Sequence, residues 1–386
     1  MSTPMPDAAA IVRSARAFEF YAQKVWPWHR RLVRGKLVPR CARCALSSKR
    51  EPLDSQGLCG PCRATPPGAA TAAPARADRS PELHALLAAH QGRGTGAYDA
   101  LLLYSGGKDS NYMLKRIRDE HPGLRLLALS VDNTFMSPIA RENIDRMIAR
   151  VDVDHLMVRH SRAFMARLFG HCLTHLNADG GYGTVDFSDG ELILDTARRV
   201  AAEQAIPLIL CGYSRYQVEN GLKLSSFESP RERELHDRSE TAGIALTDIV
   251  QGDGLRHWWR ASDFAPERVA RMVFPMYAWD LEEDAVRAQV RAWGLMREGY
   301  DSPIVTNHAL IPLIGVVDVH QLGYSSFEIE FCRMIRDGKA DLAHWRNVFE
   351  LLEYTSRTGM FVRPPVQQGL QMLGLSLADV GVRFDA

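Results

Sequence analysis

Six residues between a short apolar run and a helical pattern most constrain how this chain folds. The run at 98–104 reads YDALLLY, and the segment at 105–110 reads SGGKDS. The residues that follow, NYMLKRIRDEH at 111–121, have the spacing of an amphipathic helix. A glycine-rich turn between a buried strand and a helix N-terminus is typical of an anion-binding loop.

The residue types in this loop favour phosphate as the anion. Gly106 and Gly107 let the backbone approach a phosphate closely, and the N–H groups and helix dipole that follow favour negative charge. Lys108 adds a positive charge, whereas Asp109 would repel phosphate and is better suited to ligate Mg²⁺ or to orient the loop. Two hydroxyl groups complete the loop, those of Ser105 and Ser110. The spacing differs from the GxxxxGK[ST] of Walker-type loops, which disfavours an enzyme that transfers a γ-phosphate.

Further apolar runs alternate with helical patterns after this loop. Runs at 124–131, 155–158 and 207–211 are separated by helical patterns that include 139–151 and 192–203. This alternation predicts an α/β fold, a parallel sheet with helices on both faces. Ligands of such sheets bind at the carboxyl ends of the strands, near a topological switch point.

Four of the seven cysteines form two tight pairs ahead of this domain. Cys41 and Cys44 make one CxxC pair, and Cys59 and Cys62 make the other, with 14 residues between them. Two such knuckles can aim four thiolates at one point, which is the geometry of a closed structural zinc site. Two redox-active CxxC pairs are the alternative, but neither pair has the strand–helix context of a thioredoxin-like motif.

The patterns divide the chain into five parts. We expect an N-terminal helical segment at 1–40, a zinc ribbon at 41–62, a flexible linker at 63–82, a catalytic domain at 83–275 and a mainly helical C-terminal region at 276–386. The basic-aromatic stretch WPWHRR at 26–31 fits either a nucleic acid contact or a packed helix with a solvated basic face. The charged run at 231–238 is interpreted as a solvated helix face. In the C-terminal region, Arg333 and Arg336 are candidates for an anionic substrate group or for the surface.

Composition excludes several classes of protein. The 386 residues include 47 Lys and Arg and 46 Asp and Glu, so the net charge of +1 gives no global argument for nucleic acid or membrane binding. The sequence contains no apolar run long enough for a spanning helix, and its start has no secretion-signal pattern. We therefore expect a cytoplasmic protein that does not associate with membranes, and the odd number of cysteines agrees with a reducing compartment.

At residues 105–110 the sequence resembles the PP-loop, or N-type, ATP pyrophosphatases. The resemblance implies that this loop, Lys108 and Asp109 included, binds the pyrophosphate end of ATP with Mg²⁺. It also implies transfer of AMP to an oxygen of the substrate, after which a nitrogen or sulfur nucleophile displaces AMP. By the same resemblance, Ser130 and Asp132 should line the adenine pocket, and Gly212 should lie near the ribose or α-phosphate.

A narrower resemblance covers most of the chain. The order of the four-cysteine ribbon, SGGKDS, DN at 132–133 and ARENI at 140–144 is similar to that in N-acetyl sugar amidotransferases, as are TNH at 306–308 and the stretch 331–338. Those enzymes replace an acetamido oxygen with nitrogen, and a glutaminase partner supplies ammonia. The family carries a cysteine pair where this chain reads GTVDFSD at 183–189, and a cysteine where it has His308. These differences leave open a small-molecule substrate other than an acetamido sugar.

These observations leave two reactions open. In the first, ammonia displaces AMP, and the chain is an amidotransferase. In the second, a cysteine persulfide displaces AMP, with Cys211 or Cys172 as the candidate catalytic thiol and a sulfur carrier as partner. For Cys211, burial as a small apolar residue is the alternative interpretation. For Cys172, which lies between His171 and His175, the alternatives are a second metal site or a plain helix face. A third interpretation is a tRNA-binding zinc-ribbon protein that has kept an ATP fold. The balanced charge disfavours both this interpretation and a tRNA substrate, and a homodimer stays open.

Overall fold

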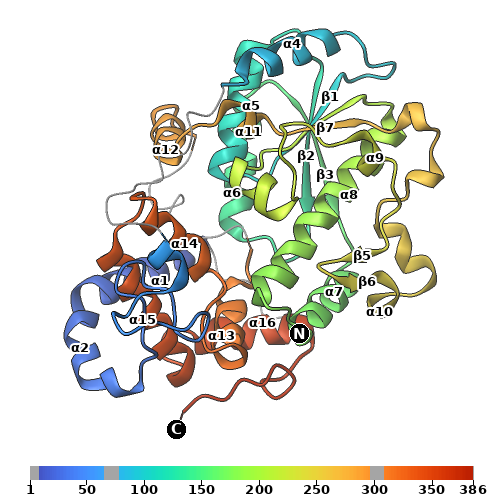
Figure 1. Ribbon diagram of the computed structural model, residues 1–386. Coiled ribbons are helices and arrows are strands. Elements are labelled where there is room, and N and C mark those ends of the chain that lie inside the picture. Colours follow the sequence, from blue (N-terminus) through green and yellow to red (C-terminus); the bar gives the residue numbers. More distant parts are fainter. Residues whose placement is uncertain (1–7, 65–77, 296–307, 386) are drawn as a thin grey trace. The chain divides into compact units, whose positions relative to one another are not determined.

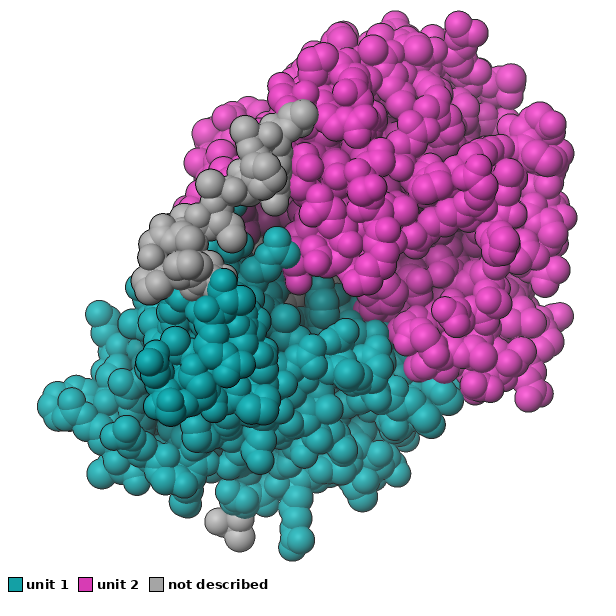
Figure 2. All heavy atoms as spheres, in the orientation of Figure 1, with its two compact units in different colours: residues 1–75, 166–186, 309–386 teal, residues 76–165, 187–308 magenta. Residues whose placement is uncertain are grey.

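The computed structural model describes residues 8–64, 78–295 and 308–385. The chain forms two compact units from interleaved stretches of sequence (Figure 2). Unit 1 consists of residues 1–75, 166–186 and 309–386, and unit 2 of residues 76–165 and 187–308. Each unit is described separately below.

The expected parts map onto these units in a different arrangement. The segment expected to be a zinc ribbon and the C-terminal helices belong to the same unit, and residue 275 lies inside unit 2. Residues 65–77 of the expected linker lie outside the described residues, whereas Ser80 already begins a helix.

Unit 2 is built on a five-stranded sheet in the order β3-β2-β1-β4-β7, in which every neighbouring pair is parallel. Ala100 pairs with Leu126 on one side and with Leu208 on the other, so the central strand is β1. The strands are β1 (Ala100–Leu103), β2 (Leu126–Asp132), β3 (Asp154–Arg159), β4 (Leu208–Leu210) and β7 (Arg271–Val273). The chain leaves β1 toward β2 first and adds β4 on the opposite side later. The switch point of the sheet therefore lies beside β1.

Helices cover both faces of this sheet and bury its central strands along their whole length. Every residue of β1 and β2 is buried, as expected for parallel strands with helices on both sides. Figure 1 shows α5 and α6 on one side and α8 on the other. Outside the insertion between β4 and β7, the unit contains α4 (Ser80–His90), α5 (Lys108–Glu120), α6 (Pro138–Ile148), α8 (Phe187–Gln204), α11 (Pro275–Trp279) and α12 (Glu283–Ala292). The prediction of an α/β fold is confirmed.

A long insertion separates β4 from β7. It consists of short elements: η4 (Gln217–Gly221), α9 (Arg231–Glu234), β5 (Glu240–Thr241), β6 (Ile244–Ala245), α10 (Leu246–Ile249), η5 (Gly252–His257), η6 (Ala261–Asp263) and η7 (Pro266–Arg268). Its anchor is Arg198 of α8, which is buried and donates to Glu234 at 2.7 Å and to Asp195 at 2.8 Å. The interpretation of 231–238 as a solvated helix face is therefore wrong, because Glu234 is 1% exposed and neutralises a buried arginine.

Unit 1 is mainly helical. Its N-terminal part contains α1 (Ala8–Phe20), η1 (Tyr21–Val25), α2 (Trp26–Val33), η2 (Arg34–Lys36) and α3 (Gly60–Ala64). The middle stretch supplies most of α7 (Arg162–Thr174) and η3 (Tyr182–Asp186), and the C-terminal part supplies α13 (Ile311–Gln321), α14 (Glu328–Arg336), α15 (Leu342–Thr358) and α16 (Arg363–Leu373). A single apolar cluster joins the first and last of these parts, including Trp26, the four paired cysteines and Trp345.

Among the described residues, none of the helices combines the length and the apolar character that crossing a membrane requires.

Candidate functional site

The loop at 105–110 lies at the carboxyl end of β1 and leads directly into α5. Gly107 caps this helix with an extended backbone, and Lys108 is its first residue. Gly106 has a φ of +73°, and a Cβ atom there would approach the carbonyl oxygen of Ala140 to 2.6 Å. Only glycine fits this position, both for its backbone conformation and for its contact with α6.

Hydrogen bonds inside the loop hold its shape. The Ser110 hydroxyl donates to the carbonyl of Gly107 at 3.0 Å and lies 3.2 Å from the Ser105 hydroxyl. Asn111 Nδ2 donates to the carbonyl of Gly106 at 3.2 Å, and the Tyr104 hydroxyl donates to Asn111 Oδ1 at 2.6 Å. Because these hydrogen bonds already order the loop, binding an anion at the helix N-terminus would cost little further conformational entropy.

Lys108 places a positive charge at this loop. Its Nζ lies 2.9 Å from Asp109 Oδ2 and 3.6 Å from Glu283 Oε1 of α12. Burial acts to lower the pKa of Lys108, but the carboxylates of Asp109 and Glu283 outweigh burial and hold that pKa above its usual value. The ammonium group is therefore present at neutral pH, with the Asp109 and Glu283 carboxylates beside it.

Ser130 and Asp132, the two residues of β2 predicted to line the adenine pocket, make different contacts. The Ser130 hydroxyl donates to the carbonyl of Tyr104 at 2.6 Å inside the sheet, and it is fully buried. Asp132, at the end of the strand, accepts from Arg141 at 2.6 Å and from Arg159 at 2.7 Å. Burial acts to raise the pKa of Asp132, but these guanidinium groups outweigh it and hold the pKa below its usual value. Asp132 is thus a fixed anion at the carboxyl edge of the sheet.

The end of β4 lies beside the loop. A Cβ atom at Gly212 would be 3.4 Å from Met113 Cε and 3.9 Å from Ser110 Cα, so Gly212 adjoins the start of α5. Cys211 precedes it and is 2% exposed. Burial raises the pKa of the Cys211 thiol to about 12, so this group is a neutral thiol at physiological pH.

Cys172 belongs to the other unit. It lies on α7 and is completely buried, and the neighbouring histidines, His171 and His175, stack on each other with ring centroids 4.0 Å apart. Within unit 2, the sequence contains one cysteine, Cys211. The two candidate thiols therefore do not form a pair inside the unit that holds the loop.

A polar cluster that the sequence analysis did not assign as a site follows β2. Asn133 Nδ2 donates to Asp189 Oδ2 at 2.8 Å, and His308 Nε2 lies 4.0 Å from the same oxygen. The Phe135 ring stacks parallel to the His308 ring at 6.3 Å. All three polar residues are buried, and burial lowers the pKa of His308 to about 4. The only signal in the sequence was that 183–189 and position 308 depart from the sugar amidotransferase pattern.

In unit 1 the four paired cysteines converge. One sulfur from each of Cys41, Cys44, Cys59 and Cys62 lies within 4.8 Å of the others, and all four residues are buried. The turn before the second cysteine pair uses Gly57, whose φ is +73° and whose amide donates to the carbonyl of Asp54. Four buried sulfur ligands around one point fit a metal ion in a closed tetrahedral site.

Arginines of the C-terminal helices lie against this cluster. Arg336 Nη1 is 3.4 Å from Cys44 Sγ, and Arg346 Nη2 donates to the carbonyl of Cys41 at 2.9 Å. Four thiolates around a divalent ion carry a net charge of about −2, which a nearby guanidinium offsets. The sequence left two roles open for Arg336, binding an anionic substrate group or lying on the surface. The structure supports neither role, because the Arg336 guanidinium contacts the cysteine cluster.

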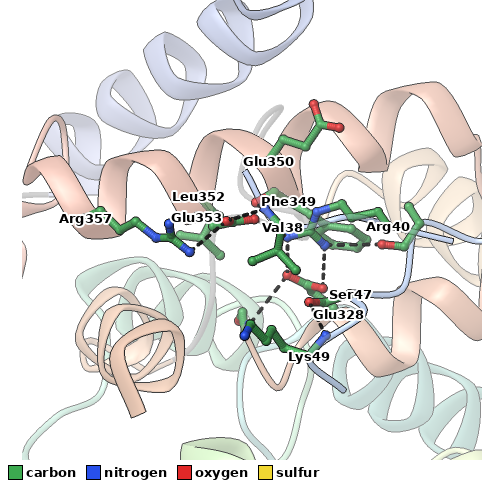
Figure 3. A network of polar contacts seen from close by, with 12 residues as sticks. Val38, Arg40, Ser47, Lys49, Glu328, Phe349, Glu350, Leu352, Glu353 and Arg357 are labelled. Atoms are coloured by element: carbon green, nitrogen blue, oxygen red, sulfur yellow. Dashed lines mark hydrogen bonds and ion pairs between the residues drawn. The ribbon is translucent and has the colours of Figure 1, made fainter. Parts of the chain in front are cut away.

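A second arginine fixes the same segment to two helices (Figure 3). Arg40 is buried and donates to Glu328 of α14 at 2.6 Å and to Glu353 of α15 at 3.2 Å. Glu353 also accepts from the amide of Val38 at 2.9 Å and from Arg357 at 3.0 Å. Because a buried arginine left without its carboxylates is strongly destabilising, this network ties the cysteine segment to the C-terminal helices.

The solved structures to which this chain is similar include two enzymes. No protein-family model and no curated protein matches this chain. The U34-tRNA thiolase NcsA from Methanococcus maripaludis, solved with its [4Fe-4S] cluster, is 13% identical over 88% of this chain and 91% of its own, with a TM-score of 0.36. NMN synthetase from Francisella tularensis is 11% identical over 75% of this chain and 94% of its own, with a TM-score of 0.37. With TM-scores this low, neither likeness decides the activity, which is argued below from the residues of this chain.

Proposed function

We propose that this protein is an ATP-dependent adenylating enzyme of the PP-loop type, which cleaves ATP to AMP and pyrophosphate and activates a carbonyl or amide oxygen for replacement by nitrogen. The observation that carries the proposal is the geometry at the end of β1. A glycine at positive φ, a helix N-terminus and a charged lysine meet at the switch point of a parallel sheet.

The loop would hold the pyrophosphate end of ATP. The first N–H groups of α5 and the Lys108 ammonium donate to phosphate oxygens, and the braced loop keeps these donors in place as charge develops on the leaving pyrophosphate. Asp109 and Glu283 are the carboxylates that would hold Mg²⁺, which supplies further neutralisation of phosphate charge when bound. A substrate oxygen then attacks the α-phosphorus, a bond to AMP forms and pyrophosphate leaves. Positioning and electrostatic stabilisation account for most of this step.

The second step favours nitrogen over sulfur. A persulfide relay needs an accessible cysteine of low pKa at the nucleotide site. Cys211 is well placed beside Gly212, but its thiol is buried and its pKa is raised, and Cys172 is buried in the other unit. Ammonia needs no protein thiol, so an amidotransferase-like reaction with a glutaminase partner or free ammonium is the better supported of the two. Sulfur transfer onto a small molecule or tRNA is the alternative.

The four-cysteine cluster is proposed to hold one structural Zn²⁺. Zinc prefers sulfur ligands in a closed tetrahedral arrangement, and four cysteines leave no open position for water or substrate. Its role is then to complete the fold of unit 1.

One experiment tests the adenylation chemistry directly. The purified chain is incubated with Mg²⁺, ATP labelled at the α-phosphorus, a panel of amide and carbonyl compounds, and either ammonium or sulfide. The expected result is labelled AMP rather than ADP, and a product whose mass shows replacement of oxygen by nitrogen. Labelled ADP would contradict the PP-loop assignment, and a product that gains sulfur would support the alternative.

A further inference from the structure

The N-terminal helical segment presents an outer face that alternates basic and aromatic residues. Along α1, η1 and α2, residues at intervals of three or four positions are all exposed, which places them on one side of the helical segment. We call this face the N-terminal stripe; it consists of Arg13, Arg16, Phe20, Lys24, Trp28 and Arg31. Phe20 is 65% exposed and Trp28 is 71% exposed, and Leu32 beside the stripe is 86% exposed.

The opposite side of the same segment provides its packing. Ala22 and Trp26 are completely buried, and Trp26 Nε1 donates to Glu350 of α15 at 3.1 Å. α1 and α2 belong to the same unit as α15, and Figure 1 shows α2 near α15. The fold of this segment therefore depends on its inner face, and the exposed aromatic rings of the stripe are not explained by packing.

This segment carries a strong excess of positive charge. Residues 8–36 contain seven Lys or Arg and a single acidic residue, Glu19, whereas the whole chain has a net charge of +1. The nearly balanced total, which argued against nucleic acid in the sequence analysis, conceals a local positive surface. Such a surface attracts a polyanion regardless of the net charge of the protein.

The pattern of residues in the stripe distinguishes nucleic acid from two other possible partners, a membrane surface and a protein. A membrane-binding helix collects its apolar residues into one continuous band, and the core of a protein interface is depleted in charged residues. Here each exposed ring has a basic residue within one helical turn on both sides, and the Arg31 guanidinium lies over the Trp28 ring at 5.0 Å. Rings for stacking bases, alternating with cations for phosphates, are characteristic of surfaces that bind unpaired nucleotides.

We propose that the N-terminal stripe binds RNA that displays unpaired bases, such as a hairpin loop. Phe20 and Trp28 would stack on bases, and Arg13, Arg16, Lys24 and Arg31 would contact the phosphates. RNA fits this surface better than DNA does. The bases of cellular DNA are paired and stacked, whereas RNA loops present unpaired bases to aromatic and arginine side chains. This surface is separate from the adenylation chemistry, so either proposal can fail without the other.

The test measures binding of the full chain to a fluorescent stem-loop RNA by anisotropy, without ATP. Four phosphate contacts on single-stranded RNA predict an affinity that falls about 50-fold between roughly 50 and 200 mM salt. The double variant Phe20→Ala, Trp28→Ala should weaken binding at least about tenfold, and the triple variant Arg16→Ala, Lys24→Ala, Arg31→Ala should weaken it and flatten the salt dependence.

Matched controls use exposed residues elsewhere in the chain. The triple variant Arg93→Ala, Arg162→Ala, Arg383→Ala removes the same charge, and Leu235→Ala with Leu281→Ala removes exposed apolar side chains; both should bind as the unaltered chain does. Metal content of the stripe variants reports that unit 1 remains folded. Equal affinity for a fully paired RNA duplex, tighter binding to vesicles of anionic lipid than to the stem-loop, or no loss in the aromatic variant would each overturn the proposal.

Discussion

The Asp189 carboxylate lies between Asn133, which donates to it at 2.8 Å, and His308, whose Nε2 is 4.0 Å from the same oxygen. Asp189 is near the start of α8, and His308 comes much later in the chain, so the fold of unit 2 brings them together beside the end of β2. When ammonia attacks an activated carbon, the nitrogen must lose a proton. With a pKa of about 4, the His308 imidazole is neutral at physiological pH and can accept that proton, and the Asp189 carboxylate 4.0 Å away would stabilise the imidazolium that forms.

We therefore predict that His308→Gln impairs the nitrogen step and spares adenylation. Glutamine keeps a polar side chain of similar size but cannot accept the proton, which typically costs roughly 10²-fold or more in rate. The measurement follows release of AMP and appearance of the nitrogen-containing product separately, over a range of ammonium concentrations. Equal loss of both, or retention of both, would show that His308 has no part in proton transfer.

His160 provides the matched control for this variant. It is buried in the same unit, its Nε2 lies 3.0 Å from Thr196 Oγ1, and burial lowers its pKa, like that of His308, to about 4. Between about pH 4 and 6.5 the unfolded chain binds a proton at each histidine that the folded chain excludes, so stability falls as pH falls through this window. Both His160→Gln and His308→Gln should flatten that dependence, but only His308→Gln should slow the nitrogen step.

Lys108→Ala and Asp109→Ala are expected to abolish formation of AMP and pyrophosphate while the fold is kept. Each removes a charge that acts on the phosphates or on the cation that accompanies them, and one such contact is typically worth roughly 10²–10³ in rate. Lys115→Ala is the control, since Lys115 lies on the same helix and pairs with Asp119 on its outer side. Near-normal turnover of either loop variant would refute the assignment of the nucleotide site.

Substituting Gly106 by alanine, and comparing it with the same change at Gly243, separates the cost of backbone strain from the cost of a steric clash. The positive φ alone costs about 1–2 kcal/mol, and the added Cβ would also press against the carbonyl of Ala140. Gly243→Ala is the control, because Gly243 has a φ of +77° with open space around its Cβ position. Thermal unfolding should show the larger loss for Gly106→Ala, together with loss of ATP binding by calorimetry. Similar stability and intact ATP binding would contradict the close contact in the loop.

One tightly bound zinc per chain is expected in protein purified without added metal. The pair of substitutions Cys41→Ser and Cys59→Ser should abolish it and destabilise unit 1, because each removes a ligand from a closed site. Cys211→Ser, in unit 2, should leave the metal content unchanged. Elemental analysis with thermal unfolding decides the point, and a full zinc content in the double variant would rule the site out. Iron with a visible absorption band would indicate a cluster instead of zinc.

The double variant Cys172→Ser, Cys211→Ser tests the nature of the nucleophile. Both side chains are buried, and serine is close in size, so the fold should persist with a modest loss of stability. If ammonia is the nucleophile, the rate of product formation with ammonium should remain within about threefold of normal, less than 1 kcal/mol in barrier height. Loss of product with AMP release intact, together with a sulfur-containing product from the unaltered chain, would establish sulfur transfer.

The sequence predicted the parallel sheet because apolar runs and helical patterns alternate along the chain. It also singled out Gly106, whose positive φ and close contact with Ala140 are what a glycine-rich phosphate loop requires. It could not assign Asp189 and His308 to one site, because only the fold brings residues so distant in sequence together. The solvated helix expected at 231–238 failed for the same reason, since the partner of Glu234 is Arg198 on α8.

The Arg40 network has a consequence for the order in which the newly made chain can fold. The carboxylates that neutralise Arg40 belong to Glu328 and Glu353, which lie 288 and 313 residues further along the chain. The stretches of unit 2 are complete by residue 308, so they are synthesised before these glutamates. This buried network of unit 1 can therefore form only after all of unit 2 has been translated.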